Sequence, residues 1–106
     1  MATLFGSPLR SDVLVAISRL QPTYPAELAR VLVRRPIEIQ RSLESLERAG
    51  VVSTRMLGRT RVVELDRRFP GAGELYSLLL RLSEERKYSD RFRDIRKRPR
   101  AMRKSL

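Results

Sequence analysis

The sequence contains no cysteine and no histidine among its 106 residues. Without cysteine the chain can form no disulfide framework and can bind no soft metal ion through thiolates. Without histidine it lacks the side chain that most often serves as general acid or base near neutral pH. The carboxylates are scattered along the chain rather than grouped. These absences argue against an enzyme, and we expect no catalytic residues, no cofactor and no metal site.

The sequence also lacks a long hydrophobic run. The longest apolar runs, such as residues 13–17, are far shorter than the roughly 20 residues that span a bilayer. The N-terminus does not combine a charged region with a long apolar run, so it does not resemble a signal peptide. A core of useful size needs roughly 60 residues or more, so the chain can form one compact domain with an appendage. We expect one domain, no membrane segment and a cytoplasmic protein.

Acidic residues are scarce: 12 Asp and Glu stand against 23 Lys and Arg, which gives a net charge of +11. The excess is concentrated in residues 86–106, which hold ten Lys or Arg against two Asp, a net +8. Residues 1–85 carry only +3. Strong positive charge attracts polyanions without selecting one, so nucleic acid, an anionic membrane and an acidic protein are all open as partners. For a cytoplasmic chain we favour nucleic acid.

The middle of the chain combines an amphipathic helix with a β-hairpin. Three apolar residues recur at three- and four-residue spacing and form one stripe that must face a core: Ile39, Leu43 and Leu46. Pro36 suits the first turn of a helix, and Gly50 suits the left-handed residue that ends one. The pattern predicts a helix over residues 36–49.

A two-residue loop of Gly58 and Arg59 predicts that residues 51–65 form a hairpin with a type II′ turn. The register pairs Leu57 with Thr60, Arg55 with Val62, Thr54 with Val63 and Val52 with Leu65. Because side chains alternate across a strand, one face carries Val52, Thr54, Val63 and Leu65, and the other carries Ser53, Arg55, Val62 and Glu64. We expect the first face to pack inward.

Two further helices are predicted ahead of this unit. Ser7 can cap a helix over residues 8–20, whose apolar residues cover more than one stripe: Leu9, Val13, Leu14, Ala16, Ile17 and Leu20. Such a helix needs contacts on two sides, and a partner subunit is one candidate for the second side. Pro25 starts another helix, over residues 25–32, and the short connector after it forces a sharp turn. The helices over 25–32 and 36–49 therefore form a helix-turn-helix.

Several short motifs follow one another in a fixed order: Leu4-Phe5-Gly6-Ser7 with Arg10, Glu27-Leu28-Ala29, Ile39-Gln40-Arg41, Leu43 with Leu46, and Ala49-Gly50-Val51-Val52 before the arginine-rich hairpin. In order and spacing they resemble ArsR/MarR-like winged-helix transcription regulators over about residues 4–82. Two positions depart from the family pattern. Val33 stands where the family often has a glycine in the turn, and Arg35 stands where it often has a serine helix cap.

The resemblance implies a mainly α fold with a two-stranded β-wing, that is, a winged helix-turn-helix with a three-helix core, a hairpin wing and a C-terminal dimerisation helix. It implies a transcription regulator that binds double-stranded DNA as a homodimer, with helix 36–49 in the major groove and wing 51–65 on the backbone or minor groove. The candidate DNA-binding residues are Arg34, Arg35, Ile37, Glu38, Gln40, Arg41, Arg55, Arg59 and Arg61.

The chemistry of these side chains agrees with that role but also has plainer explanations. Arginine can grip guanine and glutamine can grip adenine, whereas Glu38 repels phosphate unless it accepts a hydrogen bond from a cytosine amino group. The plainer explanations are a solvated helix face and a charged hairpin edge that prevents sheet aggregation. Four glutamates are expected to be solvated or to form ion pairs with Arg48 and Arg81: Glu44, Glu47, Glu84 and Glu85.

Beyond the polar connector over residues 66–73, four leucines mark a helix over residues 72–85: Leu75, Leu78, Leu79 and Leu82. The resemblance assigns this helix to dimerisation, and the alternative is that its leucines close the core of a monomer. We expect residues 1–85 to form the DNA-binding domain and residues 86–106 a basic extension. Tyr88, Phe92 and Ile95 continue a helical spacing there, as far as about residue 97, before Pro99.

Two other functions are open. One is a winged-helix protein-interaction module, such as an antitoxin-like partner of an enzyme, without sequence-specific DNA binding. The other, which we favour less, is a basic RNA-binding protein. The arginines of helix 36–49 and of the hairpin favour DNA, because a pure protein-binding module would not need them. The resemblance points to no particular effector, and a thiolate-bound metal is excluded as a signal because the chain has no cysteine.

Overall fold

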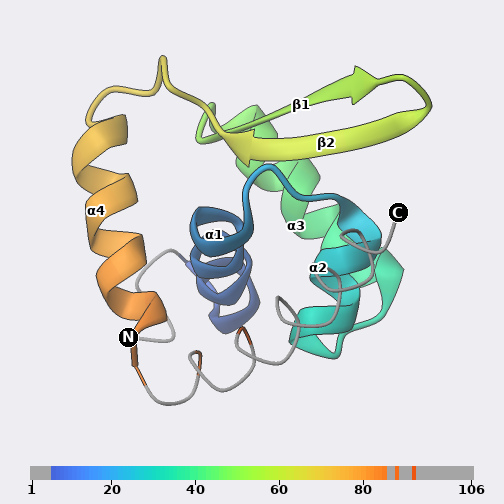
Figure 1. Ribbon diagram of the computed structural model, residues 1–106, viewed down its shortest axis with the longest axis horizontal. Helices are drawn as coiled ribbons and strands as arrows, with labels where there is room; N and C mark the ends of the chain where they lie inside the picture. The colour runs from blue at the N-terminus through green and yellow to red at the C-terminus, as the bar shows by residue number, and fades with distance from the viewer. Residues whose placement is uncertain (1–5, 86–87, 89–91, 93–106) are drawn as a thin grey trace, which may run out of the picture.

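The computed structural model describes residues 6–85 together with residues 88 and 92 (Figure 1). The elements follow one another as α1 (Pro8–Leu20), α2 (Pro25–Leu32), α3 (Pro36–Arg48), β1 (Val52–Leu57), β2 (Thr60–Leu65) and α4 (Ala72–Ser83). The two strands pair as an antiparallel hairpin. Helices and hairpin in this order make a winged helix-turn-helix, so the predicted fold class is confirmed.

The first helices begin where the sequence predicts. Ser7 caps α1, because its Oγ accepts a hydrogen bond of 3.0 Å from the backbone N–H of Arg10. A proline stands at the start of each of α1, α2 and α3, where its missing N–H leaves no helical bond unmade. In the first turn of α2 the buried carboxylate of Glu27 accepts a hydrogen bond from the Thr23 hydroxyl. That carboxylate also lies at the positive end of the helix dipole, where a negative charge is stabilised.

Helix α3 ends at Arg48, one residue earlier than predicted. Gly50 has a φ of +81°, the left-handed conformation expected of it. The N–H groups of Gly50 and Val51 donate to the carbonyl oxygens of Glu47 and Leu46, at 3.0 and 3.1 Å. This is the Schellman pattern, which satisfies the last carbonyls of a helix and turns the chain directly into β1.

Helix α1 lies at the centre of the fold, with α4 on one side and α2 and α3 on the other (Figure 1). Residues 13–18 and Leu20 are all buried. The prediction of contacts on two sides is therefore confirmed. The suggestion of a partner subunit on the second side needs correction, because α4 of the same chain packs there. A side-chain hydrogen bond of 2.7 Å from Arg10 Nη2 to Ser45 Oγ also ties α1 to α3.

The hairpin has the predicted register along its whole length. Gly58 alone of the two loop residues has a positive φ, +66°, as a type II′ turn requires. Val52, Val63 and Leu65 are buried, so the expected inner face does pack against the core.

Val62 corrects the prediction for the outer face, because it is only 6% exposed. The connector between α1 and α2 runs along the edge of β2 that β1 leaves open. There Thr23 pairs with Val63, and Gln21 Oε1 accepts a hydrogen bond of 2.9 Å from the Leu65 backbone N–H. The chain therefore flanks β2 on both edges, and Val62 is buried in this flanked part of the strand. Strand alternation alone could not reveal this neighbour, which comes from far earlier in the sequence.

Val33 ends α2 in the left-handed conformation, with φ 54° and ψ 55°. The backbone N–H of Arg34 donates to the Ala29 carbonyl at 2.9 Å, which closes the turn. A β-branched residue is strained in this region, and the Val33 side chain is 80% exposed, so burial does not offset the strain. The helix-turn-helix thus keeps its turn without the glycine that the family often has there.

The core extends beyond α4, which ends at Ser83 rather than at the predicted residue 85. Tyr88 and Phe92 are helical and buried, and their rings stack with centroids 6.1 Å apart. The Tyr88 hydroxyl donates to Asp12 Oδ1 of α1. The segment predicted to be a basic extension therefore begins with residues that complete the core. Ile95 and the predicted end of the helix near residue 97 lie outside the described residues. No helix in the described part is long and apolar enough to cross a membrane.

Candidate nucleic-acid interface

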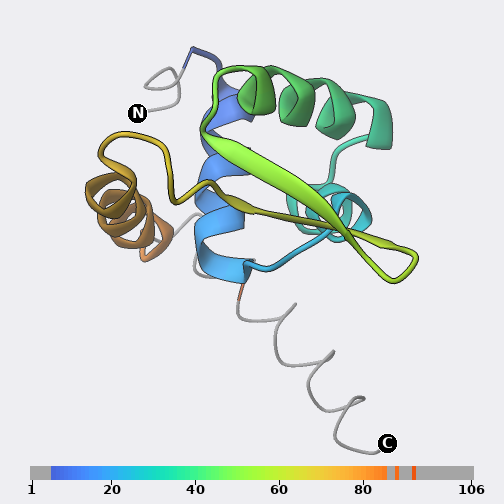
Figure 2. The same cartoon turned by 90° about the horizontal axis from the view of Figure 1, so that it is seen from above.

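The predicted DNA-binding residues lie on the turn after α2, on the outer side of α3 and on the hairpin. In two views the hairpin loop projects beyond the helices (Figures 1 and 2). All the predicted residues are exposed except Glu38, which is partly buried: Arg34, Arg35, Ile37, Gln40, Arg41, Arg55, Arg59 and Arg61. The fold therefore brings them to the surface from elements that neighbour one another.

Glu38 organises the start of α3. Its Oε1 accepts a hydrogen bond of 3.2 Å from the Arg35 backbone N–H, which is the glutamate's half of a capping box. A serine at position 35 would supply the other half by accepting from the N–H of residue 38, but arginine has no acceptor atom for that bond. Glu38 Oε2 lies 3.6 Å from Arg34 Nη1 and 4.0 Å from Arg35 Nη2. Glu38 therefore has a structural role at the start of α3, in addition to the base contact that the sequence predicts for it.

The outer side of α3 changes character along its length. Ile37, Gln40 and Arg41 are exposed in its first half, and within the described residues neither Gln40 nor Arg41 has a hydrogen bond or ion pair from its side chain. The second half presents Glu44 and Glu47. A polyanion is therefore attracted more strongly to the start of the helix than to its second half, where Arg48 is exposed beside Glu44 and Glu47.

The three hairpin arginines differ in their partners. Arg55 Nε lies 3.2 Å from Glu64 Oε2 across the outer face. Arg61 Nη2 lies 3.7 Å from Glu47 Oε1 on the inner face. Arg59, in the loop, forms no ion pair with any residue that the structure describes. It is the hairpin arginine that is freest to meet an anion.

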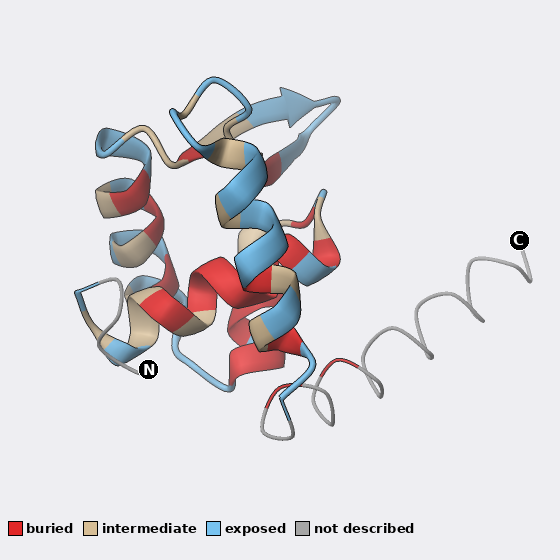
Figure 3. Ribbon diagram, turned by 90° about the vertical axis from the view of Figure 1, so that its left-hand side faces the viewer, coloured by how far each residue is buried: buried red, intermediate tan, exposed pale blue. Residues whose placement is uncertain are grey.

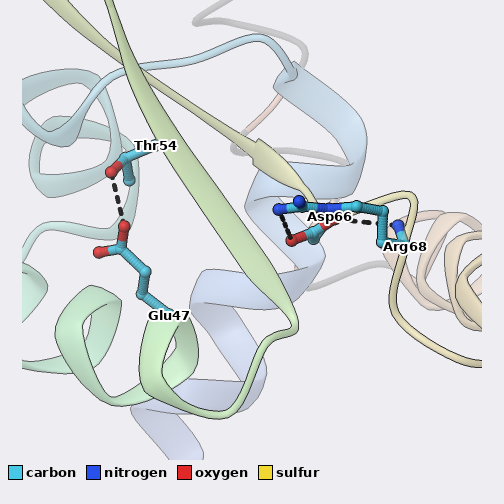
Figure 4. A network of polar contacts seen from close by, with 4 residues as sticks. All are labelled: Glu47, Thr54, Asp66 and Arg68. Carbon is cyan, nitrogen blue, oxygen red and sulfur yellow. Dashed lines mark hydrogen bonds and ion pairs between the residues drawn. The ribbon is translucent and has the colours of Figure 1, made fainter.

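Glu47 is exposed, as the sequence predicts, but its ion-pair partner among the described residues is Arg61 rather than the expected Arg48 or Arg81. Besides Arg61, it contacts Thr54, whose Oγ1 donates to Glu47 Oε2 at 2.8 Å (Figure 4). Sequence reasoning missed this link because it considered partners three or four residues away. The strand pattern held the signal, since Thr54 and Arg61 both fall on the hairpin face that packs toward the helices.

A cavity of about 310 Å³ lies where helix-turn-helix and hairpin meet. Its lining comes from the start of α2, from α3 and from β2: Pro25, Ala26, Pro36, Gln40, Leu43 and Arg61. A hollow therefore lies between the two candidate contact surfaces, which are the helix-turn-helix and the hairpin.

A second cavity, of about 450 Å³, lies between the end of β2 and α4, and its lining includes Gln21, Glu64, Asp66 and Tyr76. Arg68 donates to Asp66 from its backbone N–H at 2.9 Å and from its guanidinium at 3.1 and 3.2 Å (Figure 4). These hydrogen bonds hold the pKa of Asp66 below its usual value. Within the described residues, no group of three acidic side chains is arranged to hold a metal ion.

The four predicted dimerisation leucines do not share one environment. Leu79 is fully buried against the core, and Leu75 and Leu82 are partly buried against it. Leu78 is 44% exposed, and nearby Tyr76 is also exposed. Figure 3 shows the outer side of α4. One side of α4 therefore closes the chain's own core and the other side is exposed, while dimerisation through this helix stays a prediction.

Comparison with known proteins places this fold in a class. No protein-family model matches the chain, and no curated protein matches its sequence. Solved structures do match. MepR, a transcription regulator of the Staphylococcus aureus multidrug efflux pump MepA, gives a TM-score of 0.60 at 10% identity, over 95% of this chain and 82% of that one. A MarR/EmrR family transcriptional regulator from Acinetobacter sp. ADP1 gives 0.60 at 15% identity, over 99% and 82%.

A mutant of S. aureus MepR bound to an oligodeoxyribonucleotide also matches, with a TM-score of 0.57 at 15% identity over 98% of this chain and 82% of that one. At these identities the likeness defines the fold. The chain has the winged-helix fold of MarR-type transcription regulators. The MarR side of the predicted resemblance is confirmed for the fold, and the ArsR side stays a prediction.

Proposed function

We propose that the chain is a DNA-binding transcription regulator that acts as a dimer, with α3 in the major groove and the hairpin on the backbone or minor groove. The observation that carries this proposal is the set of exposed arginines on the turn, on the first half of α3 and on the hairpin loop, within a winged-helix fold. The structural neighbour bound to an oligodeoxyribonucleotide supports the same partner class.

Gln40 and Arg41 are the residues that we assign to base reading. Arginine can bind O6 and N7 of guanine, and glutamine can bind N6 and N7 of adenine, through paired hydrogen bonds in the major groove. Ile37, partly exposed one turn earlier, fits the methyl group of thymine. All three lie in the half of α3 that is free of unpaired carboxylates.

Other arginines are assigned to phosphate. Arg34 and Arg35 flank the start of α3, where their guanidinium groups lie 3.6 and 4.0 Å from Glu38. Arg59 in the hairpin loop is placed to contact backbone or minor groove beside the site read by α3. Such contacts set the register of a protein on DNA and carry no sequence information of their own.

The exposed side of α4 supplies the dimer contact in this proposal. Leu78 and Tyr76 are large and exposed on a helix whose opposite side is buried. Two recognition helices must lie about one DNA turn apart, ~34 Å, to read successive major grooves. A two-fold pairing through α4 would hold them in that relation.

A gel shift tests the proposal against its alternatives. The full chain would be titrated against the DNA upstream of its own gene, a random duplex of equal length and a structured RNA, all at one salt concentration. A regulator shifts its own upstream DNA at a concentration at which the random duplex and the RNA stay free. Equal binding to all three would contradict sequence-specific DNA recognition.

The main alternative is a protein-interaction module, such as an antitoxin-like partner of an enzyme. Met56 and Leu57, next to the hairpin loop, are the observation that favours it, since both are well exposed and apolar. A module of this kind would show no preference for its own upstream DNA in the gel shift. We favour DNA, because arginines surround this apolar pair.

A further inference from the structure

Glu47 joins α3 to both strands of the hairpin. Its Oε2 accepts a hydrogen bond of 2.8 Å from Thr54 Oγ1 of β1, and its Oε1 lies 3.7 Å from Arg61 Nη2 of β2. Figure 4 shows the carboxylate directed from the end of α3 toward Thr54. One side chain of α3 therefore contacts both strands.

The link from Glu47 lies where the buried base of the hairpin meets its exposed end. The base of the hairpin is fixed by apolar packing, since Val52 and Val63 are buried in the core. Residues 55–61 are exposed on both strands and in the loop. Thr54 and Arg61 lie at the boundary between these two parts. In the described part of the chain, no other side-chain hydrogen bond or ion pair joins α3 to the hairpin.

The link also holds an arginine of the candidate interface. Arg61 and Gln40 both line the 310 Å³ cavity, and Glu47, on the second half of α3, holds the Arg61 guanidinium against that helix. The two side chains are 43% and 40% exposed, so a phosphate can replace the carboxylate as the partner of Arg61.

We propose that Glu47 is a positioning residue that fixes the angle between α3 and the wing, and thereby raises the preference for specific over random DNA. This inference rests on the proposed function. A wing held at one angle contacts the DNA only where α3 also fits the major groove. Its conformational entropy is already lost in the free protein, so ordering the wing costs little on binding. A wing without this link can change its angle, so it contacts the phosphate backbone of random DNA as readily as that of the specific site.

Glu44 provides a matched control, because it lies on the same helix, is exposed and has no contact with the hairpin among the described residues. Glu44→Ala and Glu47→Ala each remove one negative charge near the DNA, so both reduce repulsion of phosphate. We expect Glu44→Ala to raise the affinity for specific and random duplexes by similar factors. Glu47→Ala should raise the affinity for random DNA more than that for specific DNA, because loss of the fixed wing angle offsets the gain at the specific site. The ratio of specific to random affinity should therefore fall roughly 2- to 5-fold, as for loss of one exposed ion pair.

Glu47→Gln separates the two contacts, since an amide oxygen can still accept from Thr54 but carries no charge for Arg61. Its ratio should lie between those of the wild type and Glu47→Ala. Equal ratios for Glu44→Ala and Glu47→Ala would overturn the proposal, because charge alone would then explain the effect.

A measurement without DNA keeps this test apart from the test of the proposed function. Backbone ¹⁵N relaxation of the free protein should give lower order parameters for residues 55–61 in Glu47→Ala than in the wild type, and unchanged values in Glu44→Ala. Unchanged order in Glu47→Ala overturns the positioning role whatever the DNA result. A wild-type protein without any DNA preference contradicts the proposed function, and the relaxation data still decide whether Glu47 positions the hairpin.

Discussion

Arginines that look equivalent in the sequence differ in what surrounds them. Arg41 and Arg59 form no ion pair within the described structure, whereas Arg55 and Arg61 each face a carboxylate. An arginine that is already paired must give up its carboxylate before it can bind a phosphate or a base, so its net contribution to DNA binding is smaller. At the scale of the residue, the account therefore ranks Arg41 first for base reading.

Replacement of Arg41 by alanine tests this ranking. If Arg41 makes paired hydrogen bonds to a base, Arg41→Ala should weaken binding to specific DNA by about 1–3 kcal/mol and relax preference at one base pair. Fluorescence anisotropy with the specific site and its single-base variants measures both effects. Arg19→Ala is the control, because Arg19 is exposed on α1, which carries none of the candidate DNA-binding residues. If the two variants bind alike while circular dichroism shows both folded, Arg41 does not read a base.

The bonds from Arg68 to Asp66 predict a pH dependence. The pKa of Asp66 is lower in the folded chain than its ordinary 3.8, so the folded state favours the ionised carboxylate. The resulting stabilisation is fully present above the ordinary pKa and is lost as the pH falls through the lowered one. Thermal unfolding from neutral to acid pH should show Asp66→Asn less stable than the wild type above about pH 5, with the gap closing in acid. A gap that stays constant into acid would contradict the assignment.

Within α4, the proposed function gives the buried and the exposed side separate roles. Leu79→Ala should lower the free energy of unfolding by about 2–5 kcal/mol, because it empties a fully buried site. Denaturant titration measures this loss of unfolding free energy. A charged residue at position 79 would disrupt the core, so such a variant could not report on dimerisation alone.

Leu78→Glu should leave the fold of each chain intact and dissociate the dimer, because Leu78 lies on the exposed side of the helix. Sedimentation of both proteins at micromolar concentration, with circular dichroism as the check on folding, measures this outcome. If Leu78→Glu remains dimeric, the dimer interface does not include this side of α4. A wild-type protein that is already monomeric would refute the dimer.

Elements could be predicted from the sequence where their signals are local. Prolines at helix starts, Gly50 after α3 and Gly58 in the loop each impose a backbone conformation, so bounds and register followed closely. Contacts between residues far apart in the sequence could not be predicted, because the spacing of residues shows which face of an element is apolar but not which residues pack against it. The link from Glu47 to the hairpin, the burial of Val62 and the burial of Phe92 all depend on neighbours that only the fold supplies.

At the scale of the whole molecule, the basic C-terminal segment should add affinity without specificity. Because Tyr88 and Phe92 belong to the core, a truncation should end after Phe92 rather than at residue 85. It removes seven Lys or Arg and one Asp, a net +6. Each phosphate contact contributes about −0.9 to the slope of log K against log salt, so the truncated chain should bind specific and random DNA more weakly by similar factors and with a shallower slope.

Sedimentation of the truncated protein checks that its oligomeric state is unchanged, since loss of a dimer would reduce binding to two-fold sites disproportionately. An unchanged salt slope with an unchanged oligomeric state would mean that residues 93–106 do not touch phosphate. Their charge would then serve an acidic protein or another surface.

The central claim is that this winged-helix chain reads a DNA sequence through α3, and repeated selection from a random duplex library tests it most directly. The account predicts that an enriched site with two-fold symmetry emerges, with half-sites about one helical turn apart, and that the protein binds it at least about a thousand-fold more tightly than random duplex at the same salt. The same selection with Arg41→Ala should lose preference at one position in each half-site. A library that stays unenriched, or affinity that does not depend on sequence, would contradict the account.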